Sequence, residues 1–156
     1  MKICRLISVV LLMVCVTGCA GTRLSVLKDY HYQETTLFSY EIIDEANVTE
    51  KGMQIFKTQF DENLKKLQLV NEASDKVIEV TFTHYYMRHG ASRALLGAMA
   101  GSDNITSQVL IKDKNTGDVL AELKVVSKNP TAFGSVQGLI KQHADKITDY
   151  IRGEKS

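Results

Sequence analysis

The chain has 156 residues and carries 19 Lys and Arg against 18 Asp and Glu, a formal net charge of +1 at pH 7. This balance gives no electrostatic reason to bind nucleic acid, so a nucleic-acid partner is excluded. The length corresponds to one domain, and the sequence shows no internal repeat or low-complexity run.

The first 18 residues have the layout of a secretory signal. Lys2 and Arg5 precede an apolar run from Leu6 to Val16, and small residues follow. A membrane-spanning helix needs about 20 apolar residues, so this run is too short to be one. We therefore predict a signal peptide over residues 1–18.

Cys19 follows Val16-Thr17-Gly18, and this tetrapeptide resembles the lipobox at which bacterial lipoprotein precursors are lipidated and then cut. The resemblance implies a mature chain that begins at an acylated Cys19. Cleavage at an ordinary small-residue site is the alternative. Cys4 and Cys15 lie in the part that would be removed, so no disulfide could form within the mature chain.

An acylated Cys19 predicts a membrane anchor, because each buried methylene contributes about 0.8 kcal/mol and bacterial lipoproteins carry several acyl chains. Ala20 and Gly21 follow the cysteine, in place of the Asp that retains many enterobacterial lipoproteins at the inner membrane. By that family rule we expect the outer membrane, with the protein facing the periplasm. The mature chain would keep 17 of the 19 basic side chains against 18 acidic ones, a formal charge of −1.

A tether and one folded domain are expected after the cleavage site. Residues 19–35 are predicted to be the lipidated cysteine and the tether, because few of them are apolar, and residues 36–152 the domain. The domain begins with an alternating strand at 36–43, and Asn47 with Glu50 forms a capping box for a helix. One apolar stripe of this helix is expected to face the core: Met53, Phe56, Phe60, Leu64 and Leu67.

Three further strands and a second helix complete the expected fold. Residues 76–87 alternate as a strand, and residues 104–128 indicate a β-hairpin in which Gly117 takes a positive φ. Pro130 and Thr131 are expected to open the last helix. The order β-α-β-β-β-α predicts an α/β (α+β) two-layer sandwich, with a mostly antiparallel sheet and both helices on one face.

The connection at residues 88–104 is long for a compact domain, and long connections are often functional. Three interpretations stay open: packing on the sheet, a protein-binding or self-association surface, and a segment that dips into a lipid surface. The residues predicted to contact a partner are the basic, glycine and large apolar residues of this connection: Arg88, Gly90, Arg93, Leu95, Leu96, Gly97, Met99 and Gly101.

Two motifs together with the lipobox cysteine resemble one known family. They are Arg93-x-x-x-Gly97-x-x-x-Gly101 before a strand, and Asp113-x-x-Thr116-Gly117 in the hairpin that follows. The chain resembles a family of small, uncharacterised bacterial envelope lipoproteins that is defined as a domain of unknown function. The resemblance is best over residues 88–124, and it implies neither an activity nor catalytic residues.

No arrangement of residues in the sequence indicates catalysis or a cofactor. The four histidines, His31, His84, His89 and His143, do not pair at a metal-ligand spacing, so no metal is expected. Ser92 lacks the context of a nucleophile, and adjacent carboxylates on a helix diverge. Because no nucleophile–base or acid–base pair can be proposed, the protein is not expected to be an enzyme.

These observations predict a non-enzymatic periplasmic lipoprotein, an accessory or assembly factor of a cell-envelope complex with a protein partner. The alternative is a ligand- or lipid-binding auxiliary lipoprotein of an envelope transporter. That alternative needs an enclosed apolar cavity between the helices and the sheet, lined by Phe56, Phe60, Phe82 and Ile140.

Overall fold

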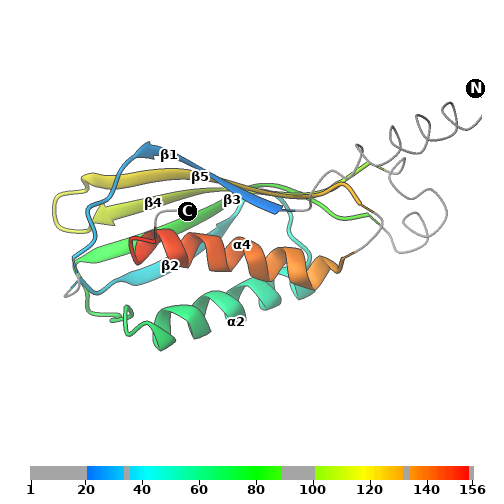
Figure 1. Ribbon diagram of the computed structural model, residues 1–156. Coiled ribbons are helices and arrows are strands. Elements are labelled where there is room, and N and C mark those ends of the chain that lie inside the picture. The colour runs from blue at the N-terminus through cyan, green and yellow to red at the C-terminus, as the bar shows by residue number, and fades with distance from the viewer. Residues whose placement is uncertain (1–20, 34–35, 89–100, 132–133, 155–156) are drawn as a thin grey trace, which may run out of the picture.

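The computed structural model describes residues 21–33, 36–88, 101–131 and 134–154. Within these ranges the chain forms an α+β sandwich in which a five-stranded sheet is covered by two helices on one face (Figure 1). The elements in chain order are β1 (Gly21–Lys28), β2 (Ser39–Asp44), α2 (Glu50–Lys66), β3 (Lys76–Tyr86), β4 (Asp103–Asp113), β5 (Val119–Asn129) and α4 (Val136–Ile151).

The sheet has the strand order β1-β5-β4-β3-β2 and is mostly antiparallel, as predicted. The β4–β5 hairpin and its neighbours β3 and β1 pair antiparallel, and β2 pairs parallel to β3. Gly117 at the tip of the hairpin has a φ of 77°, which confirms its predicted role in the turn. The expected fold class is therefore confirmed, with β1 as one additional strand.

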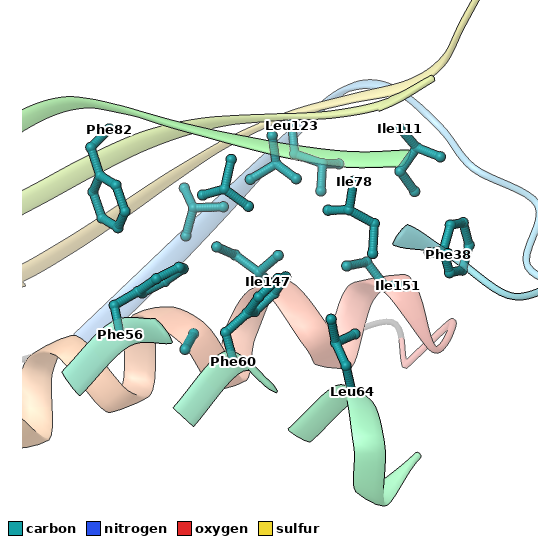
Figure 2. Close-up of a cluster of buried hydrophobic side chains, with 14 of the residues drawn as sticks. Phe38, Phe56, Phe60, Leu64, Ile78, Phe82, Ile111, Leu123, Ile147 and Ile151 are labelled. Atoms are coloured by element: carbon teal, nitrogen blue, oxygen red, sulfur yellow. The ribbon is translucent and has the colours of Figure 1, made fainter. Parts of the chain in front are cut away.

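The core lies between the sheet and the two helices (Figure 2). Phe56, Phe60 and Leu64 of the predicted α2 stripe are at most 1% exposed, and they face inward-pointing residues of the central strands. The ring centroids of Phe56 and Phe82 lie 4.8 Å apart in an edge-to-face contact. The four residues proposed to line a cavity, Phe56, Phe60, Phe82 and Ile140, are each at most 2% exposed and fill this space themselves.

The starts of both helices differ from the predicted ones. Thr49, and not Asn47, caps α2, because its hydroxyl accepts a hydrogen bond from the amide of Gly52 at 3.2 Å. Asn47 instead has a φ of 54° in the turn before the helix. Ser135, five residues beyond Pro130, caps α4 through the amide of Gly138.

The predicted tether is wrong over residues 21–28, because these residues form the edge strand β1. β1 pairs with β5 from Gly21 to Lys28, with one irregularity between Val26 and Lys28. The segment after it is also attached to the domain, because Tyr150 of α4 donates a hydrogen bond to Asp29 at 2.8 Å. The folded domain therefore begins by residue 21 and not at residue 36.

Candidate functional site

A buried polar network crosses the core below the sheet. His143 of α4 lies between Ser107 of β4 and Ser127 of β5, with its Nε2 and Nδ1 each 2.8 Å from a serine Oγ. The Ser127 hydroxyl also lies 2.7 Å from the Thr22 hydroxyl of β1. A neutral imidazole has one donor and one acceptor nitrogen, so one serine accepts and the other donates. The network thus links the edge strand to the helix layer.

The surroundings of His143 keep its ring neutral. The side chain is fully buried, and the rings of Phe56 and Phe82 lie 6.1 and 6.0 Å from it, centroid to centroid. Burial lowers the pKa of His143 from 6.5 to about 3, because an imidazolium would be desolvated there. Neither Ser107 nor His143 is exposed to solvent, so the pair cannot reach a substrate and acts as a structural network.

Arg88 and Asp103 form a second buried polar cluster, at the end of the sheet where β3 ends and β4 begins. The side chains of both are 0% exposed, and Nη2 of Arg88 lies 3.2 Å from Oδ2 of Asp103. The guanidinium also donates to the carbonyl oxygens of Gly101, Asn129 and Thr131 at 2.7 to 2.9 Å. One arginine therefore holds together the ends of β3, β4 and β5.

This placement corrects the prediction for Arg88, whose guanidinium contacts the domain itself and not a partner. Gly101 is exposed and has a φ of 85°, so its position does not contradict the prediction that it contacts a partner. The other predicted partner-binding residues lie outside the described residues: Gly90, Arg93, Leu95, Leu96, Gly97 and Met99. Cys19 also lies outside them.

A surface groove runs between β1 and α4. It has a volume of about 620 Å³ and is lined on one side by Thr22 to Val26 and on the other by Lys146 and Tyr150. Val26, one of the lining residues, is 44% exposed. Burial, together with the hydrogen bond to Asp29, raises the pKa of Tyr150 to about 12, so its hydroxyl stays protonated.

The outer edge of β1 is open. β1 is the last strand of the sheet and pairs on one side with β5, and within the described ranges no strand pairs with its other side. The opposite edge strand, β2, has six residues against eight in β1, and each strand carries two charged side chains: Arg23 and Lys28 on β1, Glu41 and Asp44 on β2. Short length protects an edge from pairing with another chain, so the longer β1 is the more accessible edge for such pairing.

The described part of the chain also bears on a metal site and a membrane-spanning helix. No group of three or more His, Cys, Asp or Glu residues there is placed to hold a metal ion. His84 is exposed on β3, where the pairing with β4 is irregular between Phe82 and His84. No helix in the described part is long and apolar enough to cross a membrane.

Sequence reasoning missed the network around His143, although a signal for it exists. Ser107 lies at an inward position between Ile105 and Val109, and Ser127 at the inward position after Val125. His143 falls beside Ala144 in the apolar stripe of α4. Buried polar side chains need hydrogen-bond partners, so these three residues could have been expected to be partners of one another. Arg88 and Asp103 could have been expected to pair in a similar way, because these opposite charges stand at the two ends of the connection between β3 and β4.

The chain forms a two-layer α+β domain with an open edge strand, and its sequence matches a known family. The chain belongs to the family described as Domain of unknown function (DUF4410), whose sequence profile matches residues 45–134. The match spans α2, β3, β4 and β5 and includes the predicted partner-binding connection. The expected resemblance to a family of unknown function is confirmed. A comparison with curated proteins gave no match.

Solved structures share this fold at low sequence identity. The PelC dodecamer from Paraburkholderia phytofirmans matches with a TM-score of 0.64 and 8% identity, over 84% of this chain and 97% of that chain. A dodecamer of a point variant of the same PelC matches over the same shares with a TM-score of 0.60 and 7% identity. Lipoprotein GNA1162 from Neisseria meningitidis gives a TM-score of 0.43 and 13% identity, over 76% and 98%, too weak a likeness for an argument.

Proposed function

We propose that the chain is a non-enzymatic periplasmic lipoprotein, anchored by Cys19, that serves as an accessory or assembly factor of a cell-envelope complex. One observation carries the proposal: the accessible edge of β1 runs beside a groove formed with α4. The buried polar clusters at His143 and Arg88 are engaged inside the domain, so they support the fold and not a reaction.

The edge of β1 suits pairing with a strand of another protein. Unpaired N–H and C=O groups on an edge strand are a template for an added strand, and the adjoining groove accommodates its side chains. The irregularity at Val26 and Lys28 ends the regular edge, so the pairing segment runs from Gly21 to Val26. This is the surface through which we propose that the protein assembles.

Copies of this chain are the partner that the comparisons favour. Both matched PelC structures are described as dodecamers, and their fold is the fold of this chain. That likeness supports self-association as the mode of assembly within the envelope complex. The filled core gives no corresponding support to the alternative of a ligand-binding transporter subunit.

The test replaces Val26 by Lys in the full chain, which is then extracted from membranes in detergent and sized by light scattering. The wild-type protein is expected to be multimeric, and Val26→Lys to shift it toward the single protomer, because a charge on an edge opposes strand pairing. Ile43→Lys on β2 is the matched control, since Ile43 is 38% exposed against 44% for Val26.

The control variant should keep the wild-type size, which separates pairing at β1 from a general effect of surface charge. Circular dichroism of each variant checks that the domain is folded. A Val26→Lys protein that is as large as the wild type would contradict the proposed surface, and a wild-type protomer extracted alone would contradict assembly altogether.

A further inference from the structure

One end of the sheet carries a row of four residues that lie directly opposite one another on neighbouring strands. Gly21 of β1 pairs with Lys128 of β5, Lys128 pairs with Asn104 of β4, and Asn104 pairs with Tyr86 of β3. Strands lie about 4.8 Å apart, so the row spans about 14 Å. In Figure 1, β1 begins at the end of the sheet where β3 ends and β4 starts.

Cys19 precedes the first residue of this row by two positions. Two residues span at most about 7 Å even when fully extended, so lipid attached to Cys19 would hold Gly21 within about 7 Å of its attachment point. The start of β1 is fixed to the domain, because Thr22 is hydrogen bonded to Ser127. An anchor at Cys19 therefore brings this end of the sheet to the membrane surface.

The side chains at this end suit a lipid headgroup region. Tyr86 is 50% exposed, and tyrosine is enriched where proteins meet the membrane interface. Lys128 is exposed, and a basic side chain is attracted to anionic lipid. The carboxylate of Asp103 beside them is buried against Arg88, so it presents no charge to a headgroup.

The connection between β3 and β4 leaves from the same end. Arg88 at its start and Gly101 at its close are joined by a hydrogen bond from Nη1 of Arg88 to the carbonyl oxygen of Gly101, 2.9 Å long. Residues 89–100 lie outside the described residues and form no part of the surface inferred here.

We infer that the end of the sheet marked by Gly21, Lys128, Asn104 and Tyr86 lies against the bilayer. The strands then rise from the membrane, and the β4–β5 hairpin tip points away from it. This inference rests on the lipidation of Cys19 in the proposed function, and it replaces a domain raised on a tether by one seated directly on the lipid surface.

The test places a fluorophore at either end of the same sheet. Tyr86→Cys and Asn115→Cys are each labelled in the full, membrane-extracted protein after reconstitution into nanodiscs that contain spin-labelled phospholipid headgroups. Asn115 is exposed at the hairpin tip, and eleven residues of β4 separate the two ends by about 36 Å. We expect the probe at 86 to be quenched and the probe at 115 to keep its full emission.

The outcomes separate the inference from the proposal on which it rests. Protein that co-elutes with nanodiscs but shows equal emission at both sites overturns the inference alone, because the domain is then anchored at a distance. Quenching at 115 and not at 86 overturns it as well, since the opposite end would face the lipid. Protein with an intact Cys19 that does not co-elute with nanodiscs overturns both.

Discussion

Replacing Arg88 by Met is expected to lower the free energy of unfolding by about 3–5 kcal/mol, because it leaves the carboxylate of Asp103 buried without its charge partner. Both side chains are 0% exposed, and the arginine also donates to backbone carbonyls at the ends of three strands. Urea unfolding followed by circular dichroism measures the loss as a lower midpoint.

Two further variants give this prediction its controls. The double variant of Arg88→Met with Asp103→Leu should be more stable than Arg88→Met alone, since it removes the unpaired charge. Lys65→Met breaks the exposed pair between Lys65 and Asp61 on α2 and should leave the midpoint within error. An Arg88→Met protein as stable as Lys65→Met would show that the buried pair does not hold the strand ends.

Acid is expected to destabilise the fold through His143, beginning near pH 6.5. The folded pKa of about 3 lies below the ordinary value of 6.5, so between these values the unfolded chain binds a proton that the folded chain does not. The stability that the neutral His143 contributes to the fold is complete above pH 6.5 and is lost as the pH falls toward 3. The slope approaches about 1.4 kcal/mol per pH unit.

Urea unfolding of the wild type and of His143→Gln at several pH values between 7.5 and 4 isolates this contribution. Glutamine can hydrogen bond to Ser107 and Ser127 but does not titrate, so the variant should lose most of the slope. Asp61, whose pKa the hydrogen bond from Lys65 lowers, acts only below its usual 3.8 and is common to both proteins. An unchanged slope in His143→Gln would refute the assignment.

The regular helices and strands could be predicted because their buried residues recur with the period of a helix or a strand. The stripe through Phe56, Phe60 and Leu64 has helical spacing, and the hairpin around Gly117 has alternating strands on both sides. These features depend on residues close in sequence. Their packing in the structure follows the predicted faces, and so the two-layer arrangement was predictable.

Edge and capping features were less predictable because distant segments decide them. β1 has only a weak alternation, in which Thr22, Leu24 and Val26 alternate with Arg23 and Ser25 before Leu27 breaks the pattern. The cap at Thr49 also depends on its neighbours, since the Asp44 carboxylate accepts hydrogen bonds from two amides of the preceding turn. Such competition between local partners is not visible in a single capping motif.

The buried polar clusters could be located from the sequence only in part. Ser107, Ser127 and His143 each stand in an apolar pattern, which signals a buried polar group, but only the packing of α4 on β4 and β5 brings them together. The same holds for Arg88, because its partners include residues more than 40 positions away. Arg88, which was predicted to contact a partner, therefore stabilises the ends of the strands.

The proposed periplasmic role and the position of the sheet end on the bilayer both depend on the lipid anchor at Cys19. Intact mass spectrometry of the full chain, extracted from membranes in detergent, tests it directly. We expect a chain without residues 1–18 whose first residue carries acyl chains, and a Cys19→Ser variant without that added mass. A wild-type chain that has an unmodified Cys19 thiol would contradict the anchor and both proposals that depend on it.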